Sequence, residues 1–153
     1  MTQDLETRIA RIEDRIAISE LRAHYCFLID QGRGREAVDL FTEDGEFHGL
    51  DSCRGREELL RFFGETIPQT LPAMWHLVHN EIIHIDGNSA TGQCYFEMPC
   101  VLKGESYVCA GHYDDVLVKQ EGKWKFKSRK VTFYYLVPLK EGWARERMRF
   151  RLE

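Results

Sequence analysis

The sequence predicts an α+β fold, with helices in the first half of the chain and an antiparallel or mixed sheet in the second. Apolar residues recur at helical spacing over residues 5–30, and strand-like runs separated by turn signals fill residues 76–137. The chain has 153 residues, of which 43% are hydrophobic, a size and composition typical of one domain with one core. We therefore expect a single domain over residues 1–153.

The first helix has a clear apolar stripe. Charged residues occupy the opposite face, and Gly32 and Gly34 are typical of the end of a helix. The stripe consists of Leu5, Ile9, Ile12, Ile16, Leu21, Tyr25 and Leu28. We expect residues 1–16 to be a helical N-terminal extension that packs on a neighbouring chain.

The rest of the chain divides into shorter elements. The expected helices cover residues 35–41 and 54–63, and Pro68 and Pro72 should end the helical part. The expected strands cover residues 76–86, 89–102, 105–119 and 123–137. The turns between them are predicted at Asp86-Gly87-Asn88, Gly104 and Glu121-Gly122. A curved sheet with helices on one face leaves a pocket at its open end.

The charge pattern argues against several classes of partner. The net charge is -4, with acidic and basic residues mixed along the chain, and no basic stripe indicates nucleic-acid binding. The Arg-rich residues 145–151 are expected to be solvated or to lie in an interface. No apolar run is long enough to span a membrane, and the acidic N-terminus is not that of a signal peptide. A cytoplasmic location is the default expectation.

The five cysteines do not form a recognisable framework. They are odd in number, widely spaced and without a Cys-x-x-Cys pair, so neither disulfides nor structural zinc are expected. We expect most of them to be buried, with a nucleophilic cysteine as the less favoured alternative. His76 and His79 would point to opposite faces of a strand, which argues against a metal pair. No metal and no cofactor are expected.

Asp30 and His76 are the strongest candidates for chemistry. Asp30 ends an apolar helical run, where its charge lies at the negative end of the helix macrodipole. His76 opens a strand-like run. If the fold brings the two together, the carboxylate orients the imidazole and makes it a general base. Alternatively, Asp30 hydrogen-bonds to a loop and His76 is a core histidine.

Other candidates are weaker from the residues alone. Strict alternation places Arg129 with Lys125 and Lys127, away from the core, unless a bulge near Ser128 changes its face. Two roles are open for Asn80: its side chain lines the pocket, or it forms hydrogen bonds with backbone groups. The second-rank candidates for the pocket lining are Tyr25 and His112.

Three stretches of the chain resemble the SnoaL-like family of the nuclear-transport-factor-2-like superfamily, and within it the branch of hexachlorocyclohexane dehydrochlorinase and scytalone dehydratase. They are Tyr25-x4-Asp30 with Ala37-Val38-Asp39-Leu40-Phe41-Thr42-Glu43-Asp44-Gly45, then His76-x3-Asn80 with Asp86-Gly87-Asn88, and Gly111-His112-Tyr113-Asp114-Asp115 with Trp124-Lys125-Phe126-x2-Arg129. The resemblance implies a cystatin-like α+β roll, in which a cone-shaped curved sheet wraps around the N-terminal helices. It also implies a base dyad of Asp30 and His76, with Arg129 assisting the departing anion.

The sequence and this resemblance favour a cofactor-independent lyase or isomerase. Its substrate is expected to be a small hydrophobic cyclic or aromatic molecule, contacted by Tyr25, Asn80 and His112. The alternative is a non-catalytic scaffold resembling the small subunit of aromatic-ring dioxygenases, or a ligand-binding module. Apolar residues expected on the exposed sheet, such as Phe133 and Tyr135, together with the N-terminal stripe, predict a homo-oligomer, trimer or dimer.

Overall fold

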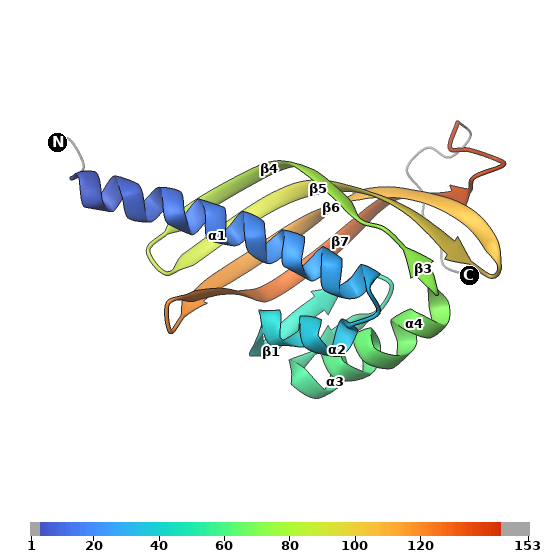
Figure 1. Cartoon of the computed structure of the whole chain (residues 1–153), viewed down its shortest axis with the longest axis horizontal. Helices are drawn as coiled ribbons and strands as arrows, with labels where there is room; N and C mark the ends of the chain where they lie inside the picture. Colours follow the sequence, from blue (N-terminus) through green and yellow to red (C-terminus); the bar gives the residue numbers. More distant parts are fainter. Residues whose placement is uncertain (1–3, 145–153) are drawn as a thin grey trace.

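The computed structural model describes residues 4–144, and its order of elements confirms the α+β prediction (Figure 1). The predicted Arg-rich segment, residues 145–151, lies outside the described residues. Helices occupy the first half of the chain and long strands the second. None of the helices within residues 4–144 combines the length and the apolar character needed to cross a membrane.

Helix α1 (Leu5–Asp30) places the candidate carboxylate at a fixed point. One face of its C-terminal half is buried, whereas the first turns project away from the other helices (Figure 1). The helix ends because Gly32 adopts a positive φ of 72°, which most side chains disfavour. The amides of Gly32 and Arg33 then donate to the carbonyls of Ile29 and Leu28, at 3.0 and 2.8 Å. This closed helix end holds Asp30 in its last turn.

Short elements follow α1: helical segments at one end of the molecule and three strands that join the sheet. They are α2 (Gly34–Ala37), a 3-10 turn (Val38–Leu40), β1 (Phe41–His48), β2 (Ser52–Arg54), α3 (Gly55–Arg61), a π-helical segment (Phe62–Thr66), α4 (Ile67–Thr70) and β3 (Ala73–Met74). Two sequence-based boundaries were wrong. Phe41 already belongs to β1, because it pairs with Phe126 across the sheet. The helical part continues past Pro68, which lies in the first turn of α4, where a missing N–H is tolerated.

Four long strands confirm the predicted meander to within one or two residues. They are β4 (Leu77–Asp86), β5 (Ser89–Leu102), β6 (Glu105–Gln120) and β7 (Lys123–Pro138). The sheet runs in the order β2-β1-β7-β6-β5-β3, with β4 also paired to β5, and it is mixed because β1 runs parallel to β7. The predicted turn at Glu121-Gly122 has φ values of 50° and 77°, as tight hairpins require.

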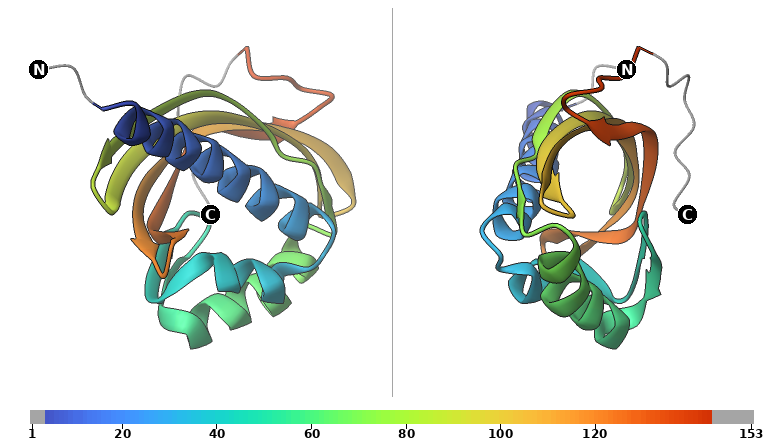
Figure 2. Two further views of the ribbon diagram at one scale, coloured as in Figure 1. Left: turned by 60° about the vertical axis from the view of Figure 1, so that its left-hand side comes forward. Right: turned by 90° about the vertical axis from the view of Figure 1, so that its right-hand side faces the viewer.

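The sheet is strongly curled, and this curl creates the interior of the molecule. Figure 2 shows the long strands bending around a central space, with α1 along one side and α2, α3 and α4 at one end. Along β5, every second residue from Ala90 to Cys100 is buried and the residues between them are exposed. The inner face of the sheet therefore packs against the helices to form the core.

Exposed apolar side chains lie on α1 and on the strands, and they differ in part from the sequence prediction. Leu5, Ile9, Ile12 and Ile16 are all exposed, as the stripe predicted for a projecting helix. Phe133 and its neighbours on β7 are only partly exposed, and Phe133 lines the interior of the molecule. The case for a homo-oligomer therefore rests on the helix stripe, and oligomerisation stays a prediction.

Candidate active site

The structure brings Asp30 and His76 into direct contact. The Nδ1 atom of His76 lies 2.6 Å from Oδ1 of Asp30, and the backbone amide of His76 donates to Oδ2 at 2.8 Å. Both oxygens of the Asp30 carboxylate therefore bind His76, and these two contacts fix the position of the histidine and the plane of its ring. The side chains are largely buried, with 13% and 6% of their surfaces exposed.

The carboxylate also determines which nitrogen of His76 is available. A carboxylate accepts hydrogen bonds, so the neutral ring places its proton on Nδ1 and donates it to Asp30. Nε2 then carries a lone pair and has no hydrogen-bond partner in the part of the chain that the structure describes. The negative charge of Asp30 is unfavourable at the negative end of the helix dipole. A protonated His76 beside it compensates for that charge. This arrangement suits a general base.

His76 lines a narrow apolar cavity between the helices and the inner face of the sheet. The cavity volume is about 40 Å³, room for a few water molecules, so a cyclic ligand enters only if the surrounding side chains move. One wall comes from the π-helical segment, which turns Phe62 and Phe63 inward together. The other apolar lining residues are Ile29, Phe47, Leu50, Ile67, Leu71, Met74, Phe96, Met98, Val131 and Phe133.

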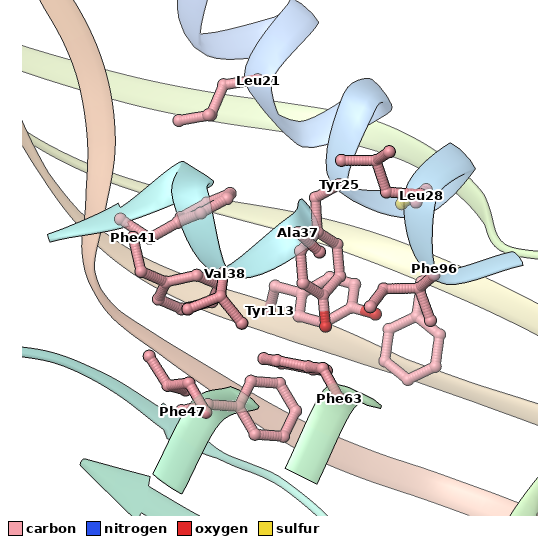
Figure 3. Packing of buried hydrophobic residues seen from close by; sticks show 14 of the residues in the cluster. Leu21, Tyr25, Leu28, Ala37, Val38, Phe41, Phe47, Phe63, Phe96 and Tyr113 are labelled. Atoms are coloured by element: carbon pink, nitrogen blue, oxygen red, sulfur yellow. The ribbon is translucent and has the colours of Figure 1, made fainter. Parts of the chain in front are cut away.

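Two tyrosines also line this cavity. Tyr25, which the sequence singled out, comes from α1, and its ring lies 6.5 Å from that of His76. Tyr113, which sequence reasoning did not select, comes from β6 and has its ring 6.4 Å from Tyr25 (Figure 3). The available signal was alternation, because Tyr113 shares a strand face with Leu117, an evident core residue.

Arg129 is buried behind these tyrosines. Leu117 pairs with Phe126 and Val116 pairs with Ser128, so Lys127 is an extra residue that reverses the facing of β7. The bulge considered from the sequence is thus present, and Arg129 is 0% exposed. Its guanidinium carbon lies 4.4 Å from the Tyr25 ring centre and 3.8 Å from that of Tyr113. Arg129 is not among the residues that line the cavity.

A chain of charges that runs from the core to the exposed Glu81 supports Arg129. Its Nε lies 3.2 Å from Oδ1 of Asp115, and Oδ2 of Asp115 accepts a hydrogen bond from Nε of Arg22 at 2.9 Å. Arg22 also donates to Glu81 at 2.8 Å. Burial alone lowers the pKa of Arg129, but the facing charge of Asp115 and the tyrosines keep it above the ordinary value. We call these four residues the arginine chain; sequence reasoning missed Arg22, Asp115 and Glu81.

Asn80 and His112 do not join this site. They line a separate hollow on the outer face of the sheet, with Gln93, Tyr95 and Tyr134. His112 is adjacent to Tyr113 in β6, so the two side chains point to opposite faces. Its ring nitrogens lie 2.8 Å from the Tyr134 hydroxyl and 3.1 Å from Asp114. The expectation that Asn80 and His112 line the same pocket as His76 was therefore wrong.

The cysteines are free and buried, and they are unsuited to nucleophilic chemistry. Burial raises the pKa of the Cys26 thiol to about 12, so it stays protonated at neutral pH. Within residues 4–144, no group of three or more His, Cys, Asp or Glu side chains has the arrangement of a metal site.

Comparisons with known proteins agree with this architecture. A family model described as a SnoaL-like domain matches residues 10–130. A hexachlorocyclohexane dehydrochlorinase structure is 19% identical, with a TM-score of 0.81, covering 86% of this chain and 93% of that one. A candidate scytalone dehydratase from Novosphingobium aromaticivorans is 24% identical, with a TM-score of 0.77 and coverage of 86% and 91%. An uncharacterized Mycobacterium tuberculosis protein is 26% identical over 129 residues, 81% of this chain and 88% of its own.

Proposed function

This chain belongs to the SnoaL-like family, and we propose that it is a cofactor-independent lyase or isomerase acting on a small hydrophobic cyclic or aromatic molecule. The observation that carries the proposal is the contact of Asp30 with His76, which lines a mostly apolar cavity. The related fold of a dehydrochlorinase and a candidate scytalone dehydratase supports it. A fold hosts many activities, so the proposal depends on the site.

The proposed first step is removal of a proton from a carbon atom of the ligand. Nε2 of His76 takes the proton, and the negative charge of Asp30 stabilises the imidazolium that forms. The electron pair of the broken C–H bond then forms a double bond. In an elimination it displaces a leaving group on the next carbon. In an isomerisation it displaces the electron pair of an adjacent double bond, and His76 returns the proton to the carbon that receives that pair.

The apolar lining strengthens this chemistry. Charges interact more strongly where water is excluded, and the carboxylate is already in place before the proton moves. We assign Arg129 a different role from the direct assistance to a departing anion that the family resemblance implied. Because it is fully buried, packs on the rings of Tyr25 and Tyr113 and does not line the cavity, we assign it an indirect electrostatic effect rather than contact with a departing anion.

The test is solvent exchange, which detects proton removal whatever product is formed. The protein is incubated in D₂O with a panel of small cyclic ketones, hydroxy compounds and halides, and mass spectrometry follows deuterium uptake and loss of water or halide. We expect activity on some of these compounds, and His76→Ala should lower it by about 10²–10⁴-fold. His79→Ala, an exposed histidine beside Tyr95, is the matched control and should retain it. Equal activity of folded His76→Ala and wild type would refute the proposal.

A further inference from the structure

The exposed apolar stripe on α1 has no role in the proposed reaction. Its members are Leu5, Ile9, Ile12 and Ile16, each with 47–63% of its surface exposed. Single exposed apolar side chains are ordinary in a folded protein, whereas four in one row on one helix are typical of a contact surface.

The body of the chain does not cover this stripe. Ile9 and Ile18 are nine residues apart, about two and a half turns of an α-helix, so they point to opposite sides. Ile18 is buried, and Asp14, on the same side of the helix, binds Lys119 and Trp124 of the sheet. The helix lies along one side of the sheet (Figure 2), and the stripe is on the side of the helix that faces away from it.

The spacing of the stripe is that of a coiled coil. Its members are four, three and four residues apart, which are the steps between the a and d positions of a heptad repeat. Ile9 and Ile16 then occupy a positions, and Leu5 and Ile12 occupy d positions. Isoleucine at a with leucine at d favours two strands, and only Ile12 departs from that combination. Because α1 is already helical and anchored to the sheet, pairing does not require a new helix to form.

The charged residues beside the stripe determine the orientation of the second helix. Glu6 and Glu13 occupy e positions and Arg8 and Arg15 occupy g positions, and all four are exposed. In a parallel pair, each g residue faces the e residue five positions further along the other helix, so Arg8 faces Glu13. In an antiparallel pair, g faces g and e faces e, which brings like charges together. Opposite charges therefore meet only in the parallel arrangement.

We infer that α1 pairs in parallel with α1 of a second copy of this chain, with the stripe as the seam between them. Arg8 and Glu13 are free to pair across this seam, since neither has an ion pair within residues 4–144. The seam is about three turns long, so the pair is expected to be weak and to form as the protein concentration rises. The cavity beside His76 takes no part in it, so the inference does not depend on the proposed reaction.

The first test is the mass of the particle in solution, measured by sedimentation equilibrium up to millimolar concentration. Wild type should reach twice the mass of Ile12→Gln, because a polar side chain interrupts the seam and leaves any other contact between copies in place. Leu139→Gln changes a residue that is as exposed as Ile12, at 58%, but lies outside α1, and it should keep the wild-type mass. Equal masses for wild type and Ile12→Gln, or a threefold ratio, would overturn the inference.

Charge reversal tests the orientation. Arg8→Glu places two carboxylates opposite each other in the parallel pair and should raise the dissociation constant about tenfold, whereas adding Glu13→Arg to it should restore the affinity. Arg11→Glu changes the net charge equally on the side of α1 that faces the turn between β4 and β5, and should have no comparable effect. In an antiparallel pair the new carboxylate would face Arg15, so tighter association of Arg8→Glu would contradict the inference.

A single cysteine gives a direct readout of the same orientation. At position 16 it faces its own counterpart in the parallel pair, whereas in an antiparallel pair the two would be about 16 Å apart along the helix. Because the five native cysteines are buried, oxidation of Ile16→Cys by diamide should join two chains through the new thiols. Ala10→Cys, on an exposed part of α1 outside the seam, should cross-link much more slowly. Equal rates for the two variants, in protein that melts normally, would refute the parallel pair.

Discussion

Asp30 with His76 and the arginine chain are two groups of buried polar side chains that meet the same physical demand differently. In the arginine chain, each carboxylate of Asp115 and Glu81 faces a guanidinium, and the arginines are otherwise enclosed by the core and aromatic rings. In the pair, both oxygens of Asp30 bind His76, but Nε2 of His76, which lines a cavity, has no hydrogen-bond partner among the described residues. Buried charges that face one another hold a structure together, although several nitrogens of Arg22 and Arg129 have no hydrogen-bond partner among the described residues. A basic nitrogen with an unused lone pair is available for a reaction.

This difference predicts that the two groups fail in different ways. Disrupting the pair should slow chemistry and leave the fold nearly intact. Disrupting the arginine chain should lower the free energy of unfolding before it alters the chemistry.

The largest expected effect is on the rate of the Asp30→Asn variant. The amide keeps the shape of the side chain but removes the charge that stabilises a protonated His76. Deuterium exchange into a bound substrate should slow by about 10²–10⁴-fold, with little change in substrate affinity. A rate within about threefold of wild type, in protein that melts normally, would remove Asp30 from the mechanism.

The next effect is on stability. Asp115→Asn leaves two buried arginines facing a neutral side chain, and should lower the free energy of unfolding by about 3–5 kcal/mol, measured by urea denaturation. Asp114→Asn is the matched control, because Asp114 is adjacent to Asp115 but lies on the outer face, with 38% of its side chain exposed. It should cost about 1 kcal/mol or less. Equal losses for the two variants would mean that the arginine chain is not the scaffold we describe.

How much of this the sequence could predict depends on the kind of signal. The order of helices and long strands follows from periodicity, and Asp30 and His76 stood out because each was out of place in its local pattern. Arg22 gave no such signal, since an arginine in an amphipathic helix is ordinarily solvated. Asp115 shares a strand face with core residues, but its partner is distant in sequence. Pairing across the fold is a tertiary property that no local pattern contains.

The facing of individual strand residues was only partly predictable. Adjacent residues of a strand point to opposite faces, so only one of His112 and Tyr113 could line the cavity. In the curled sheet, Tyr113 is on the inner face and lines it. Arg129 needed a bulge at Lys127, which strict alternation does not reveal. One inserted residue therefore decides whether a strand arginine is solvated or buried.

A smaller effect is expected where a glycine makes room for the arginine chain. A Cβ atom at Gly92 would lie 2.5 Å from Nη2 of Arg22 and 2.6 Å from the Ile82 carbonyl oxygen. Gly92→Ala should therefore cost about 1–3 kcal/mol in urea unfolding, while the exchange rate of the folded protein stays near wild type. Thr91→Ala, one residue away on the outer face, should change stability by about 0.5 kcal/mol or less. A tolerated Gly92→Ala would show that Arg22 has room to move.

The smallest effect is expected for the partly exposed ion pair of Asp14 and Lys119, which we compare with the arginine chain. Burial alone raises the pKa of Asp14, but hydrogen bonds from Lys119 and Trp124 outweigh it and hold the pKa below the ordinary 3.8. Because the folded pKa is the lower one, this stabilisation is present above the unfolded value and disappears as the pH falls through the folded value. Asp14→Asn should cost about 1 kcal/mol or less at pH 7, and the difference should shrink below about pH 4. A difference that grows on acidification would contradict this sign.

The measurement that tests the central claim most directly is ¹⁵N NMR of the histidine side chains, which requires no substrate. In its neutral form, His76 should carry its proton on Nδ1, in a strong hydrogen bond to Asp30, and should show the signal of a bare nitrogen at Nε2. In Asp30→Asn this tautomer should lose its dominance. A wild-type His76 with its proton on Nε2 would leave no free lone pair facing the cavity, and would contradict the assignment of His76 as the base.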